Sequence, residues 1–225
     1  MARRYSRRWA VFPPEIIFTA VLLVGAGLAG LLLNSKVQPA RTGKTGQAGR
    51  SVQAARKITP ASTRLGSAFL DLEQLARANS INEADNARWS LVRGTPGAAG
   101  VYSPGDGVDW QRLRTLNQSG SYDLPNGATW SFNDTFGGGP GYKMASGALA
   151  GGQCALATVF RAAAIQAGLP NQAIPHQWPV PGFPLDETVT IWWGRDDLRL
   201  HNPTSQDLKL DWELSPQGIA ISIRS

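Results

Sequence analysis

An uncharged apolar run near the N-terminus constrains this chain of 225 residues more than any other feature. Residues 16–33 (IIFTAVLLVGAGLAGLLL) contain no charged side chain over 18 positions. A helix of that length would measure about 27 Å, close to the hydrocarbon thickness of a bilayer. The run follows four arginines, Arg3, Arg4, Arg7 and Arg8. The positive-inside rule therefore predicts a cytoplasmic basic tail (1–15), a transmembrane helix (16–33) and a C-terminal domain outside the cell.

A cleaved signal peptide is the rival interpretation of this run. Signal peptides have an apolar core of about 7–15 residues that ends at a small-x-small cleavage site. The present run is longer, and residues 37–40 (VQPA) make a poor cleavage site. We therefore favour an uncleaved anchor, which predicts a single-pass protein of the plasma membrane. Gly25 and Ala29 have the spacing of small residues through which two such helices pack, so a weak homodimer through this helix is a further expectation.

The distribution of charge argues against a nucleic-acid-binding protein. Residues 1–70 hold 11 of the 22 Lys and Arg residues and one acid, whereas residues 71–225 carry more acids than bases. A nucleic-acid reader is expected to concentrate its basic residues on the folded module. One cysteine and two histidines also leave no basis for a disulfide framework or a metal site, and we expect no cofactor. The glycine loop 137–143 lacks the spacing of a phosphate-binding loop.

The rest of the chain divides into a stem and one folded domain. Residues 34–64 are polar and show no sustained apolar period, which predicts a flexible stem. Residues 65–225 predict an α+β domain in which a Cys-bearing helix packs on an antiparallel sheet. Periodicity predicts helices over 65–79, 109–116 (capped by Asp109) and 154–168, and strands over 89–92, 128–133, 188–193, 197–201, 207–214 and 218–224.

Cys154 opens the last of these helices, and its neighbours suggest chemistry. A thiol at a helix N-terminus lies at the positive end of the dipole, which favours the thiolate. His176 follows the helix and Asp186 comes ten positions later, so the three side chains form a candidate nucleophile, base and orienting group. Gln153 and Gly152 directly precede the cysteine and are candidates for oxyanion support.

Each of these residues also has a structural interpretation. A lone cysteine is often a small buried apolar residue. His176 can bond a loop carbonyl, and Asp186 can cap a turn ahead of the next strand. The aromatic candidates for a peptide or sugar groove are equally suited to core packing: Trp130, Phe132, Tyr142 and Trp178.

Several motifs resemble the VanW-like family over about 120–215. They are residues 125–133 (PNGATWSFN), 141–143 (GYK), 151–154 (GGQC), His176, 186–189 (DETV) and 196–204 (DDLRLHNPT). The chain departs from the family pattern at Ala155, where the family has glutamine, and at 173–174, where it has an Arg-His pair. The resemblance implies a bacterial cell-envelope protein of the type associated with glycopeptide antibiotic resistance.

Two functions follow from the motifs and the resemblance together. The first is a thiol acyltransferase or amidase that acts on the peptide of the cell wall (peptidoglycan), with Cys154, His176 and Asp186 as its catalytic residues. The second is a non-catalytic module that binds cell-wall peptide or glycan, in which the cysteine is structural. Accessibility and reactivity of the thiol distinguish the two.

Overall fold

The computed structural model describes residues 62–225. The basic tail, the predicted transmembrane helix and nearly all of the predicted stem lie outside the described residues. Within the described part of the chain, no helix has the length and apolar character needed to cross a membrane. The α+β class predicted for the domain is confirmed, since helices and antiparallel sheets both occur.

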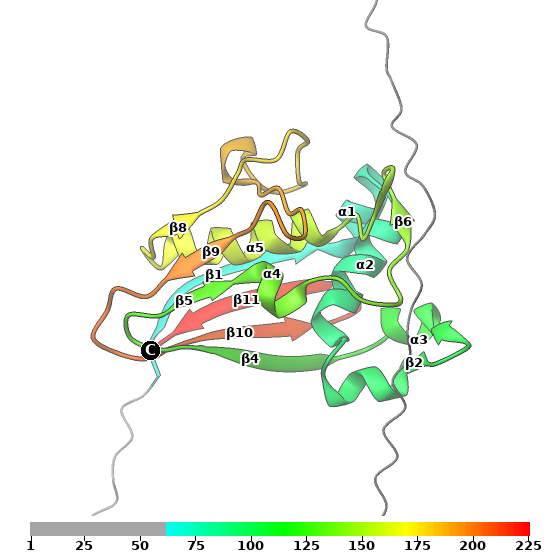
Figure 1. Cartoon of the computed structure of the whole chain (residues 1–225), viewed down its shortest axis with the longest axis horizontal. Coiled ribbons are helices and arrows are strands. Elements are labelled where there is room, and N and C mark those ends of the chain that lie inside the picture. Colours follow the sequence, from blue (N-terminus) through cyan, green and yellow to red (C-terminus); the bar gives the residue numbers. More distant parts are fainter. Residues whose placement is uncertain (1–61) are drawn as a thin grey trace, which may run out of the picture. The chain divides into compact units, whose positions relative to one another are not determined.

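A four-stranded antiparallel sheet forms the centre of the domain, with the order β1-β11-β10-β4 (Figure 1). Its strands are β1 (Arg64–Asp71), β4 (Gln118–Leu124), β10 (Leu208–Leu214) and β11 (Gly218–Arg224). Strand β11 alternates as predicted, and Ile219, Ile221 and Ile223 are all buried. The last two predicted strands are therefore confirmed as a hairpin.

Helix α5 (Gln153–Gln166) packs on one side of this sheet, against β1 and β11 (Figure 1). Its buried side chains include Leu156, Val159 and Phe160. Gly66 of β1 allows the close approach, because a Cβ atom there would clash with the backbone oxygen of Ala163. The helix ends before Gly168, as predicted.

A smaller sheet with the order β5-β9-β8 also packs against α5. It contains β5 (Thr129–Ser131), β8 (Asn171–Gln172) and β9 (Arg199–His201), and α4 (Phe132–Phe136) follows β5 directly. Trp130 stacks on Phe160 of α5 with 5.1 Å between the ring centroids, and Phe132 lies 4.7 Å from Phe136 by the same measure. Trp130 and Phe132 are buried core residues, so they do not line a binding groove.

Two further helices carry part of the candidate site. They are α1 (Leu72–Ala78), capped by Asp71, and α2 (Ile81–Val92), capped by Ser80. Helix α2 packs against α5, and α1 packs against α2 and the edge of the sheet. The remaining elements are short: η1 (Pro96–Gly100), β2 (Tyr102–Ser103), β3 (Gly107–Val108), α3 (Trp110–Arg114), β6 (Met144–Ala145), β7 (Ala148–Leu149) and η2 (Leu185–Glu187). Asp109 caps α3 as predicted, since its side chain accepts from Arg112 N.

Three predicted elements are wrong in part or in full, each for a physical reason. The predicted helix 65–79 is confirmed only in its second half, as α1; residues 64–71 form a strand because pairing with β11 overrides the helical spacing of Leu65 and Phe69, which are both exposed. Residues 89–92 belong to α2, which is buried on all sides from Glu83 to Val92 and so shows no polar face. Residues 188–193 form only isolated bridges, because this extended segment bonds to α5 through Thr158 and Cys154.

Candidate functional site

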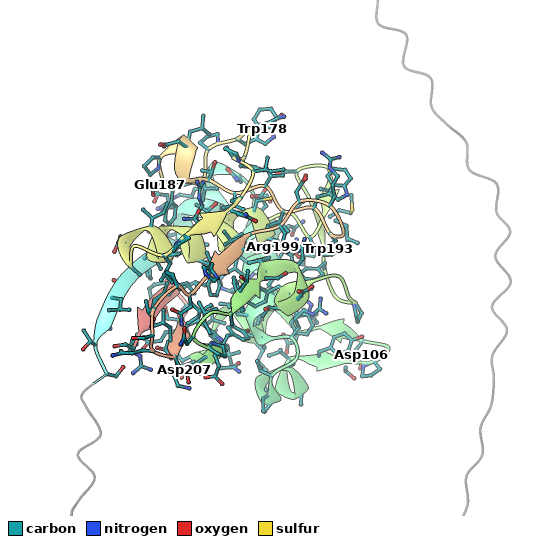
Figure 2. The ribbon with its side chains drawn as sticks, turned by 60° about the vertical axis from the view of Figure 1, so that its left-hand side comes forward. Asp106, Trp178, Glu187, Trp193, Arg199 and Asp207 are labelled. Atoms are coloured by element: carbon teal, nitrogen blue, oxygen red, sulfur yellow. The ribbon has the colours of Figure 1, made fainter. Side chains whose placement is uncertain are left out.

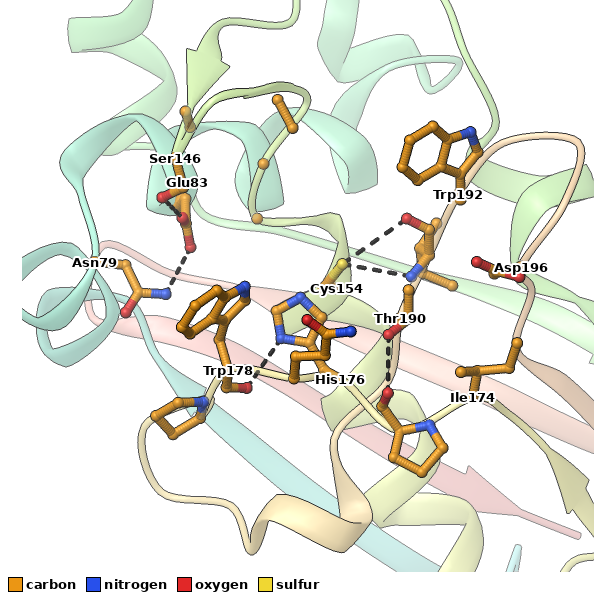
Figure 3. A pocket seen from close by; sticks show the side chains of 18 of the residues that line it. Asn79, Glu83, Ser146, Cys154, Ile174, His176, Trp178, Thr190, Trp192 and Asp196 are labelled. Atoms are coloured by element: carbon orange, nitrogen blue, oxygen red, sulfur yellow. Dashed lines mark hydrogen bonds between the residues drawn. The ribbon is translucent and has the colours of Figure 1, made fainter. Parts of the chain in front are cut away.

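A cleft of about 830 Å³ lies at the N-terminal end of α5 (Figure 3). Its walls come from α1 and α2, the β6–β7 hairpin, and two loop segments, 174–179 and 190–196. These segments are distant in the sequence and meet only in the fold. The polar side chains that line the cleft are Asn79, Glu83, Ser146, Cys154, His176, Gln177, Thr190, Arg195 and Asp196.

Cys154 lies in the first turn of α5 and faces this cleft. The turn depends on Gly152, which has a φ of 111° and caps the helix. A Cβ atom at Gly152 would clash with the backbone oxygen of Glu83, so only glycine fits between α2 and α5. The thiol is partly exposed, and Ile191 N–H donates to its sulfur over 3.4 Å.

Burial raises the pKa of the Cys154 thiol, the hydrogen bond from Ile191 N–H lowers it, and the charge of Glu83 raises it further. The net direction is upward. This is opposite to the direction expected from a helix N-terminus alone. The thiol is therefore held mainly as S–H near neutral pH in the free protein, and a base is required to activate it.

His176 lines the same cleft as Cys154, and its imidazole makes one hydrogen bond (Figure 3). Its Nδ1 lies 2.9 Å from the backbone oxygen of Trp178. Because a carbonyl oxygen can only accept, Nδ1 carries a proton, and in the neutral imidazole the lone pair is on Nε2. The main chain is fixed as well, since His176 N–H donates to Thr188 Oγ1 over 3.2 Å. No direct bond joins the imidazole to the sulfur among the hydrogen bonds of the described residues.

Asp186 does not take the role of orienting group that the sequence suggested. It is exposed on η2, and its carboxylate does not line the cleft. Its backbone oxygen accepts from Arg161 over 2.8 Å. The Trp178 carbonyl occupies the orienting position instead, because the loop after His176 turns back on the imidazole.

Gln153 does not provide oxyanion support, because its side chain is buried away from the cleft. Its Oε1 accepts from Trp193 Nε1 over 2.6 Å, and its Nε2 donates to Tyr142 OH over 2.8 Å and to the Phe136 oxygen over 3.1 Å. Tyr142 is thereby committed to the same buried network. Figure 2 shows Trp193 close to the body of the domain and Trp178 on the projecting loop. Trp178 is the one aromatic candidate of the four that lines the cleft, and 67% of it is exposed.

Two groups missed by the sequence reasoning complete the site. Ile191 directs its backbone N–H at the sulfur, and Glu83 of α2 lines the cleft although it is only 7% exposed. The position of a backbone N–H group cannot be predicted from a motif of side chains. Glu83 follows Ser80 with the spacing of a helix capping box, which is a signal for the start of α2 but gives none for the cleft.

Residues outside the cleft hold the loops around it. Asp197 accepts from Ser131 Oγ over 2.8 Å and from Asn133 N–H over 2.9 Å. Asn86 of α2 bonds both ends of the segment that precedes Cys154: its Nδ2 donates to the backbone oxygens of Lys143 (3.0 Å) and Gly151 (2.8 Å). These bonds fix the cysteine relative to α2.

Comparisons with known proteins agree with these motifs. Residues 121–224 match the family model described as VanW like protein. No curated protein and no solved structure gave a significant match. Within residues 62–225, no group of three or more His, Cys, Asp and Glu side chains is placed to hold a metal ion. The matched segment contains Cys154 and His176 together with the loops that position them, and over this segment the chain is similar to VanW-like proteins.

Proposed function

We propose that the domain catalyses thiol-dependent acyl transfer or amide hydrolysis on a peptide substrate. Cys154 is the nucleophile and His176 the general base. The observation that carries the proposal is the hydrogen bond from His176 Nδ1 to the Trp178 oxygen, which leaves Nε2 available as the base on a residue that lines the same cleft as Cys154. A carbonyl orienting group serves the same purpose as a carboxylate, although it stabilises the imidazolium less.

The proposed reaction has two balanced steps. His176 Nε2 takes the thiol proton as the sulfur attacks the peptide carbonyl, and the imidazolium then protonates the leaving amine, which gives a thioester. Water or a second amine next attacks the thioester, its proton passes to His176, and the thiol is regenerated. The backbone N–H of Cys154, at the start of α5, is a candidate for stabilising the oxyanion.

We also propose the cellular setting that the sequence predicts. Residues 16–33 would anchor the chain in the plasma membrane and place the domain outside, where cell-wall peptide is the available polymer. The VanW-like match supports this proposal through the family resemblance, and the peptide substrate fits a cleft wall made of extended segments.

The rate of Cys154 alkylation by iodoacetamide, measured against pH on the full-length chain in detergent micelles, tests the chemistry. The single cysteine makes the signal unambiguous. We expect measurable labelling of the folded protein near neutral pH that falls at least tenfold in His176→Ala. His201→Ala is the matched control, because His201 lies on β9 and pairs with Thr129 outside the cleft. Labelling that requires unfolding, or that is equal in both variants, contradicts the proposal.

A second candidate function has its own observation. Trp178, Trp192 and Ile174 line the cleft with 67%, 62% and 51% of their surface exposed, which favours a module that binds peptide or glycan without reacting. In that case Cys154→Ala binds cell-wall fragments as tightly as the wild type and the thiol is inert.

A further inference from the structure

Glu83 is a buried carboxylate without a cation. Three acidic side chains are buried in the described part of the chain: Glu83, Asp85 and Asp196. Asp85 contacts one lysine and two arginines, and Asp196 lies 3.4 Å from Arg195 Nε. Within residues 62–225, Glu83 forms no ion pair. Burial of an unpaired carboxylate is costly, so this arrangement requires an explanation.

The carboxylate of Glu83 retains hydrogen-bonding capacity. Its Oε2 accepts from Asn79 Nδ2 over 2.7 Å, and its Oε1 accepts from Ser146 Oγ. An ionised carboxylate offers about four acceptor positions. Both recorded donors are neutral side chains that themselves line the cleft, so they orient the carboxylate there without neutralising its charge.

The surroundings of Glu83 suit a primary ammonium group. Figure 3 shows Glu83, Asn79, Ser146 and Trp178 at one end of the cleft, Trp192 and Asp196 at the other, and Cys154 with His176 between them. An ammonium group has three donors for the free acceptor positions, and the exposed face of Trp178 adds a cation–π contact. At the opposite end of the cleft, the protein itself provides a cation: the Arg195 guanidinium carbon lies 5.3 Å from the centroid of the Trp192 ring.

We propose that the Glu83–Trp178 end of the cleft is a subsite for a primary ammonium group of the peptide substrate. This inference rests on the proposed function for the identity of the substrate as a peptide. A bound ammonium group would provide the counter-ion that Glu83 lacks. It would also offset the field of Glu83 at Cys154, which raises the pKa of that thiol in the free protein. A substrate of the right charge would thus help to activate the nucleophile.

Two small probes that differ only in charge test the subsite. Nα-acetyl-lysine N-methylamide carries the ammonium group, and its Nε-acetylated derivative does not. We expect calorimetric titration of the full-length chain to give at least tenfold tighter binding of the charged probe. Glu83→Gln should remove the difference between the probes. Glu213→Gln, which neutralises an exposed acid on β10 outside the cleft, should retain it.

Equal affinity for the two probes in the wild type overturns the inference, as does a preference that persists in Glu83→Gln. If circular dichroism shows that Glu83→Gln does not fold, Trp178→Ala tests the same subsite from its exposed wall, and unchanged binding of the charged probe then counts against it. The titration does not depend on the thiol and is repeated with Cys154→Ala. An inert cysteine with intact probe selectivity refutes the catalytic proposal alone, and a reactive cysteine without selectivity refutes the subsite alone.

Discussion

Replacing Asp85 with asparagine would remove the only negative charge from a cluster of three cations. The Asp85 side chain is fully buried in α2 and accepts from Arg114 Nε (2.8 Å), Arg114 Nη2 (2.6 Å) and Lys143 Nζ (2.8 Å). Arg88 Nη1 lies 3.8 Å away. Burial by itself would raise the pKa of Asp85, but the hydrogen bonds from Arg114 and Lys143 outweigh it, and the pKa is lowered.

Asparagine has nearly the same shape as aspartate, but it has no negative charge. Its amide N–H₂ group would also face the N–H donors of Arg114 and Lys143, which need an acceptor. Breaking a buried pair by removing one partner costs about 3–5 kcal/mol. Arg114 and Lys143 keep 28% and 24% of their side chains exposed and can turn toward water, so we expect about 3 kcal/mol for Asp85→Asn. For a domain of this size that lowers Tm by about 6–12 °C.

Urea unfolding of the wild type and of Asp85→Asn at several pH values is the assay. The pKa of Asp85 is lowered in the folded state, so its contribution is complete above the unfolded pKa of about 3.9 and is lost as the pH falls through the folded value. The difference between the two proteins should be constant near neutral pH and shrink in acid. Asp123→Asn is the control, because Asp123 pairs with Lys209 on the surface, where such pairs contribute about 0–1 kcal/mol. Similar losses in the two variants would refute the reasoning.

Two further substitutions test the frame of the cleft. In Gly152→Ala, a side chain would have to adopt a φ of 111° and would clash with the Glu83 backbone oxygen. The free energy of unfolding, measured with urea, should therefore fall by about 2–4 kcal/mol. A fall below about 1 kcal/mol would mean that α2 and α5 separate easily. Trp193→Phe removes the donor to the buried Gln153 Oε1 and should cost about 1–3 kcal/mol in thermal unfolding; an unchanged Tm would show that water replaces the donor.

The elements that could be predicted from the sequence are those with one buried and one exposed face, because their apolar and polar residues then alternate with a regular period. Strand β11 alternates because one of its faces lies under α5, and α5 ends at a glycine with a φ of 70°. Helix α2 was missed because it is buried on all sides and has no polar face. The helix predicted over 65–79 began too early, because pairing with β11, more than a hundred residues later, makes residues 64–71 the strand β1.

The candidate site was predictable only in part, for a similar reason. Cys154 and His176 were found by residue type and by their closeness in sequence, and both line the cleft. The Trp178 carbonyl and the Ile191 N–H are backbone groups, which side-chain motifs do not record. Gln153 was assigned to the oxyanion because it precedes the cysteine, yet the helix turns its side chain into the interior.

The position of α2 determines where the protein can be shortened. The family match begins at residue 121, but Glu83 lines the cleft and Asn86 fixes the segment before Cys154. A fragment cut to the matched segment would have a cleft open on one side. It would also lack β1, which would leave the apolar strand β11 as an unpaired edge that invites aggregation. Shortened fragments and domain fusions should therefore start before β1, at about residue 62.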